Sequence, residues 1–147
     1  MSCKIAIILG SKSDVEKMQS CLFILNKAKQ KYDLYILSAH RNPDKVRDFA
    51  VNASKKGYKV IIAAAGMAAA LPGVVAAYTD LPVIGVPIKT STFKGIDSLL
   101  SIIQMPSGVP VGTVAVGEAG VKNSALLALR ILGLLDSDVL KKMKLVK

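Results

Sequence analysis

The chain has 147 residues, a length that fits one compact domain and is too short for two. Hydrophobic residues make up 52% of it, which excludes disorder, and 20 Lys and Arg against 10 Asp and Glu give a net charge of +10. The most apolar stretch, residues 60–77, is interrupted by Gly66, Pro72 and Gly73, so no membrane span is expected. The first apolar run is too short for a signal peptide, and the two cysteines form no metal or disulfide motif. We therefore expect a cytoplasmic protein without a bound metal.

The basic residues avoid the segments that we expect at the centre of the fold. Lys and Arg are absent between Lys59 and Lys89, and Glu118 is the only charged residue from 101 to 120. The other basic residues fall on helix-like stretches and the C-terminal tail, without interleaved aromatic residues that could stack on bases. They are typical of solvated helix faces, and we expect no nucleic-acid partner.

Apolar β-branched runs alternate with amphipathic segments along the chain. The runs predict strands at 5–9, 32–37, 60–64, 82–86 and 111–116. Helical spacing of apolar residues predicts helices at 13–25, 43–56, 72–79, 96–103 and 125–132. Because parallel strands need helical crossovers, this order predicts an α/β fold, a three-layer sandwich with a five-stranded parallel sheet. We expect residues 1–147 to form a single domain that ends in a short basic helix at 136–147.

Two helix starts carry recognisable signals. Ser13 and Glu16 have the spacing of a capping box, in which the Ser side chain accepts a backbone N–H of the first turn. Asn42 stands before Pro43, as an N-cap before a proline at the first helical position.

Ligands of open parallel sheets bind outside the carboxyl ends of the strands, so the residues after each strand are the candidates. The first strand is followed by Gly10-Ser11-Lys12-Ser13-Asp14. Its hydroxyl and backbone N–H groups can receive a phosphate, and the Asp14 carboxylate can accept from sugar hydroxyls. In the alternative interpretation, Ser13 and Asp14 only cap the helix.

The second strand is followed by Ser38-Ala39-His40-Arg41-Asn42-Pro43. His40 is the only histidine of the chain, and imidazole titrates near neutral pH, as general acid and base catalysis requires. The adjacent Arg41 can grip a phosphate or a carboxylate. We interpret His40 as catalytic from its position, the alternative being a structural histidine.

The third strand is followed by small residues from Ala63 to Gly73, which leave room for a flat substrate or allow tight helix or subunit packing. After the fourth strand, the polar loop 89–95 is either a lid or a source of helix caps.

Taken together, these segments resemble a known family, and the resemblance covers residues 4 to about 135. The segments that carry it are 10–14 (GSKSD), 38–41 (SAHR), 71–74 (LPGV), 104–111 (QMPSGVPV) and 123–128 (NSALLA). In this order and spacing they are similar to the landmarks of the N5-carboxyaminoimidazole ribonucleotide mutase family of the purine pathway. The resemblance implies a flavodoxin-like subunit, a homo-octamer, no metal or organic cofactor, and a ribonucleotide substrate. It also implies that His40 acts as general acid and base while a carbamate is isomerised to a ring carboxylate.

The resemblance also implies the substrate-binding residues. Ser11 and Asp14 would bind the ribose 5-phosphate, and Ser38 and Arg41 would hold phosphate and carboxylate groups. The remaining family positions are those next to the base, Ala65 and Gly66, together with Ala39 and Leu71.

The chain departs from the family at two points. The mutase branch usually has a second histidine where this chain has Ala70, and the C-terminal tail is shorter than in many relatives. A related branch carboxylates aminoimidazole ribonucleotide directly and has lysine after the motif histidine, so Arg41 favours the mutase. Direct carboxylation, a nucleotide- or flavin-binding module without chemistry and an inactive relative remain the alternatives.

Overall fold

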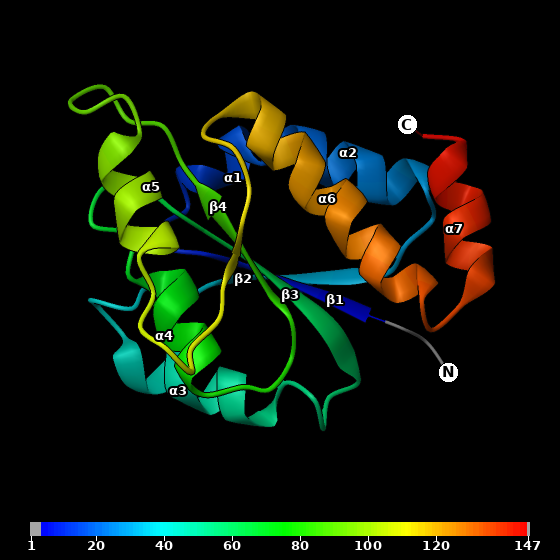
Figure 1. Ribbon diagram of the computed structural model, residues 1–147, viewed down its shortest axis with the longest axis horizontal. Helices are drawn as coiled ribbons and strands as arrows, with labels where there is room; N and C mark the ends of the chain where they lie inside the picture. The colour runs from blue at the N-terminus through cyan, green and yellow to red at the C-terminus, as the bar shows by residue number, and fades with distance from the viewer. Residues whose placement is uncertain (1–3, 147) are drawn as a thin grey trace.

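The computed structural model describes residues 4–146, so Cys3 and the last residue of the predicted C-terminal helix lie outside it. In this part of the chain, five parallel strands form one sheet in the order β2-β1-β3-β4-β5 (Figure 1). The strands are β1 (Lys4–Leu9), β2 (Tyr32–Ile36), β3 (Tyr58–Ala65), β4 (Val83–Pro87) and β5 (Gly112–Thr113). This is the flavodoxin-like strand order, and the predicted fold class is confirmed.

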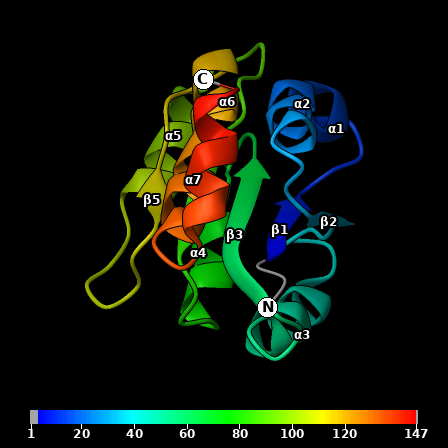
Figure 2. The ribbon, with the colours of Figure 1, turned by 90° about the vertical axis from the view of Figure 1, so that its right-hand side faces the viewer.

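Helices cover both faces of the sheet. They are α1 (Asp14–Lys17), α2 (Gln19–Lys27), α3 (Pro43–Asn52), α4 (Leu71–Ala77), α5 (Ile96–Ile103), α6 (Glu118–Gly133) and α7 (Ser137–Lys144). α2 and α6 lie on one face, and α3 and α4 lie on the other (Figures 1 and 2). None of the helices within residues 4–146 is long and apolar enough to cross a membrane.

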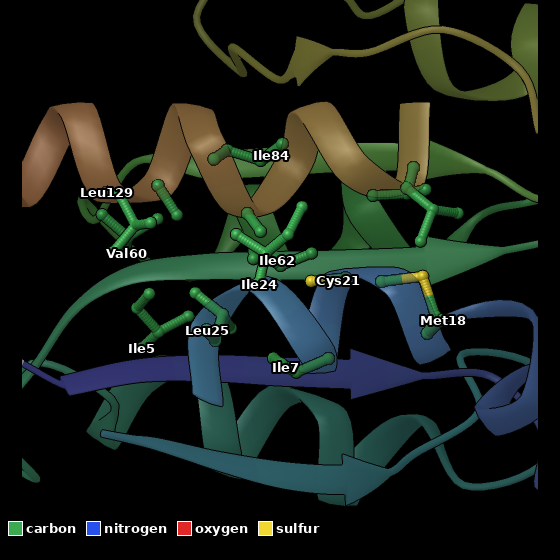
Figure 3. Close-up of a cluster of buried hydrophobic side chains, with 14 of the residues drawn as sticks. Ile5, Ile7, Met18, Cys21, Ile24, Leu25, Val60, Ile62, Ile84 and Leu129 are labelled. Carbon is green, nitrogen blue, oxygen red and sulfur yellow. The ribbon is translucent and has the colours of Figure 1, made fainter. Parts of the chain in front are cut away.

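The sheet divides the core into two layers. Ile5 and Ile7 of β1 point toward α2 and α6, as Figure 3 shows, whereas Ala6 and Ile8 point toward α3. All four are fully buried, which explains why β1 reads as a continuous apolar run instead of an alternating one. Burial of each isoleucine side chain stabilises the fold by about 1.5–3 kcal/mol.

The structure corrects the predicted first helix. Met18, with φ −97° and ψ 6°, interrupts it and separates α1 from α2. The capping box does not form, because Ser13 is already helical and its side chain makes no cap hydrogen bond. The Ser13 hydroxyl instead pairs with the Ser11 hydroxyl at 2.9 Å.

The last elements also differ from expectation. β5 is only Gly112–Thr113 instead of 111–116, because its ladder with β4 covers just two residue pairs, Ile84–Gly112 and Gly85–Thr113. α6 begins at Glu118, about two turns before the predicted helix. The predicted C-terminal helix is present as α7, and Val139 and Met143 are buried where it packs on α6 (Figure 2).

Candidate active site

The loops after β1, β2 and β3 meet at one end of the sheet, because β1 lies between β2 and β3 and all three strands run parallel. Strand order reverses at this point, which is where open α/β sheets bind their ligands. The loops surround a cavity of about 500 Å³. All nine residues that the sequence predicts for the site line it: Ser11, Asp14, Ser38, Ala39, His40, Arg41, Ala65, Gly66 and Leu71.

The β1 loop contributes hydroxyl groups and a carboxylate. Ser11 Oγ accepts the backbone N–H of Ser13 at 3.3 Å, in addition to the contact between the two hydroxyls. Asp14 is only 7% exposed, and this burial raises the pKa of its carboxyl group above the usual value. Lys17, with Nζ 3.8 Å from Asp14 Oδ1, and Arg41 oppose the rise of that pKa. The cavity thus holds a partly desolvated acceptor beside two cations.

The β2 loop presents the imidazole and the guanidinium. His40 and Arg41 are both exposed and line the cavity. Within residues 4–146 no group hydrogen-bonds to the His40 ring, so both ring nitrogens are open to a ligand. The backbone beneath them is fixed, since the Arg41 N–H donates to Ser38 Oγ at 3.2 Å.

The β3 loop forms the floor of the cavity with small side chains. A Cβ at Gly66 would lie 3.1 Å from Thr90 Cγ2, so a larger residue would crowd the loop after β4. The segment of small residues is divided between two places: Ala63 and Ala64 are buried in the core of β3, whereas residues 65–71 line the cavity. The departure from the family pattern, Ala70, also faces this cavity.

Three residues of this wall were not singled out from the sequence, although two of them lie in the candidate segments 63–73 and 89–95. Lys17 follows Asp14 by one helical turn, a spacing that could have signalled the pair. Met67 lines the cavity with a left-handed φ of 57° and a side chain that is 68% exposed. Thr90, from the polar loop 89–95, is the third. The loop supplies no helix cap, because Gly95 precedes α5 without a side-chain bond.

Not every landmark of the resemblance reaches this cavity. Gly108, Val109 and Pro110 line a separate open cleft of about 1010 Å³ near the amino end of β4. Exposed apolar residues of α3 and α6, Val51 and Leu127, lie in the same cleft. In residues 4–146 no group of three or more His, Cys, Asp or Glu side chains could hold a metal ion.

The strand order defines a flavodoxin-like α/β protein, and the cavity lies at the switch point where proteins of this class bind small ligands. Residues 4–147 match the AIR carboxylase family over almost the entire length, and the chain belongs to that family.

Relatives in several organisms share about half of its residues. The chain is 51% identical over 143 residues to the N5-carboxyaminoimidazole ribonucleotide mutase of Haemophilus influenzae, covering 97% of this chain and 87% of the relative. It is 52% identical over 141 residues to the protein of that name in Saccharolobus solfataricus, covering 96% and 88%. The crystal structure of Treponema denticola PurE superposes with a TM-score of 0.84 at 28% identity, covering 96% of this chain and 87% of that one.

Proposed function

We propose that this protein is an N5-carboxyaminoimidazole ribonucleotide mutase of purine biosynthesis, with His40 as its general acid and base. One observation carries the proposal: all nine residues that the motifs nominate converge on a single cavity. The relatives at about 50% identity bear the name of this enzyme. The resemblance seen in the sequence and the geometry of the fold thus support the same reaction.

The proposed reaction needs one proton carrier. Protonated His40 gives its proton to the exocyclic nitrogen of the carbamate, and the N–C bond breaks to release CO₂ and aminoimidazole ribonucleotide. Ring carbon 4 then attacks CO₂ and forms the new C–C bond. Neutral His40 finally removes the proton from carbon 4, which regenerates the starting imidazolium. Atoms and protons balance without ATP, a metal or an organic cofactor, and one imidazole serves as acid in the first step and as base in the last.

Retention of CO₂ is the second requirement of this mechanism. In this proposal the segment from Ala65 to Leu71, mostly alanine, walls one side of the cavity and holds CO₂ beside the ring while the ribonucleotide fills the rest. Confinement makes recombination effectively unimolecular, which raises its rate.

The substrate contacts follow from the chemistry of each wall. In this proposal the hydroxyl of Ser11 and the carboxylate of Asp14 bind the ribose 5-phosphate. Ser38 and Arg41 hold phosphate and carboxylate groups, since guanidinium can pair with either through two bonds. The base lies against Ala65 and Gly66, with Ala39 and Leu71 completing the wall.

Turnover of the carbamate by wild type and by His40→Asn tests this function. Wild type should convert the carbamate to the ring carboxylate without ATP, and His40→Asn should lose about 10²- to 10⁴-fold in kcat with its thermal unfolding unchanged. The family description, AIR carboxylase, also names the competing reaction. Rapid product formation from aminoimidazole ribonucleotide and bicarbonate, but not from the carbamate, would replace the mutase by that carboxylase. Full activity of His40→Asn would refute the role of His40.

We further propose a single 147-residue domain that assembles as a homo-octamer in the cytoplasm. An apolar stripe on α5 supports assembly: Ile96, Leu100 and Ile103 are 59%, 55% and 54% exposed at successive helical turns. Light scattering should give about eight times the 15.5 kDa chain mass. Leu100→Lys should reduce that mass, and one cooperative unfolding transition should be seen for the dissociated chain.

A further inference from the structure

Asn42 is absent from the cavity wall, yet it binds the backbone of the loop that carries His40. Its side-chain Oδ1 accepts the Ser38 N–H at 2.7 Å, and its own N–H donates to the Ser38 carbonyl oxygen at 3.0 Å. The two bonds join the same pair of residues, so they close the segment from Ser38 to Asn42 into a ring. Both backbone polar groups of Ser38 are fixed in this way.

His40 depends on this ring for its placement. Within residues 4–146, one other hydrogen bond crosses the turn, from the Arg41 N–H to Ser38 Oγ at 3.2 Å. His40 is exposed, and no group within residues 4–146 makes a hydrogen bond that would orient its ring. The direction in which His40 and Arg41 point is therefore set by the backbone that Asn42 holds.

The local sequence predicts a different task for this amide. An Asn that precedes a helix normally accepts an N–H of the first turn. Here Asn42 stands at the N-cap position of α3, with φ −140° and ψ 60°, and makes no side-chain cap bond. The predicted capping role of the side chain is wrong, and its acceptor serves the active-site loop instead of the helix.

We propose that Asn42 is a positioning residue, which holds the Ser38–Asn42 turn so that His40 and Arg41 face the substrate. Its effect on turnover rests on the proposed function. Its effect on the loop does not, because the hydrogen bond to the Ser38 amide is a property of the folded chain.

The test compares Asn42→Ala with Asn42→Asp, which keeps an acceptor at the same reach. Asn52→Ala is the matched control, since the Asn52 side chain also hydrogen-bonds to the backbone of α3, its Nδ2 donating to the Asp48 carbonyl oxygen at 2.8 Å at an exposed position. Amide hydrogen exchange of Ser38 reports the contact directly, and kcat and KM report its consequence. Exchange at Ser38 should rise about tenfold or more in Asn42→Ala, with kcat falling at least about tenfold. Asn42→Asp should restore protection and much of kcat, and Asn52→Ala should change neither.

Two results would overturn the proposal. One is an Asn42→Ala protein with wild-type kcat and a protected Ser38 amide. The other is an Asn42→Asp protein that protects Ser38 but is as slow as Asn42→Ala. If Asn42→Ala does not fold, Asn42→Leu, of similar volume and without an acceptor, takes its place. An inactive wild type would instead refute the proposed function, while the exchange rates would still decide the contact.

Discussion

Replacement of Gly66 by alanine measures how tightly the floor of the cavity is packed. The new Cβ would lie 3.1 Å from Thr90 Cγ2, closer than ordinary contact, and 3.5 Å from the Ile88 carbonyl oxygen. Overpacking of this kind costs about 1–3 kcal/mol, and the smaller unfolded-state entropy of alanine offsets about 0.4–1 kcal/mol of it. We expect Gly66→Ala to lower the free energy of unfolding by about 1 kcal/mol.

A second substitution shows whether the Thr90 methyl group is the cause. Thr90→Ser removes that methyl group, after which the nearest neighbours of the new Cβ are Ile88 atoms at 3.5 and 3.6 Å. Gly66→Ala should then be neutral or slightly stabilising, so the two changes couple by about 1 kcal/mol, or about 2–4 °C in Tm. Denaturant unfolding of the wild type, both single variants and the double variant gives this coupling. Equal destabilisation by Gly66→Ala in both backgrounds would refute the reasoning.

Three further predictions concern single side chains. Burial raises the pKa of Asp14, so its ionised form disfavours folding, and Asp14→Asn should have a higher Tm than wild type at pH 7. This difference in Tm should disappear as the pH falls to about 4, where the wild-type carboxyl group is also neutral. The variant should bind substrate less well, because it lacks the carboxylate. A lower Tm of Asp14→Asn at pH 7 would contradict this sign. Burial also raises the pKa of the Cys21 thiol to about 11, so in a Cys3→Ser background the native protein should resist a thiol reagent at pH 8 and react only when unfolded. Ala70→His should increase kcat/KM in the mutase assay, because position 70 lines the cavity and the mutase branch usually has histidine there. An unchanged kcat/KM would argue that a histidine at position 70 does not act on the substrate.

The fold was predictable because its strongest signals are local and its core is deeply buried. β1 and β3 are apolar on both faces, and only a parallel sheet between two helical layers buries such strands completely. β5 was predicted too long: its sequence resembles a strand, but its ladder with β4 pairs only Gly112 and Thr113, and the chain leaves the sheet after the Val114 N–H donates to the Gly85 carbonyl oxygen. An apolar run in the sequence does not show where the chain leaves its neighbouring strand.

The position of the candidate site could be predicted from the sequence, but the list of its residues was incomplete. Strand ends converge by topology, so residues after β1, β2 and β3 had to lie together. Lys17 was not predicted, because a lysine on a helix is usually solvated and its partner Asp14 becomes buried only in the folded chain. The contact of the Asn42 side chain with the loop was not predicted, because its two possible partners, the first turn of the helix and the Ser38 N–H, both lie within four residues of it in the sequence.

The helix starts show how this fold divides stability and function. Within residues 4–146, α1 to α6 all begin without a side-chain cap, and three of them, α1, α3 and α4, begin at the loops that line the cavity. α7, which packs on α6 away from the sheet edge, has an ordinary cap in which Asp136 accepts the Asp138 N–H at 3.0 Å. A cap contributes about 1 kcal/mol, so the sequence forgoes that stabilisation repeatedly at the functional edge of the sheet and keeps it at the periphery. The side chains that could have capped, Ser13 and Asn42, are instead hydrogen-bonded within the loops that build the cavity. Capping signals at the carboxyl ends of parallel strands therefore indicate loop architecture as readily as helix starts.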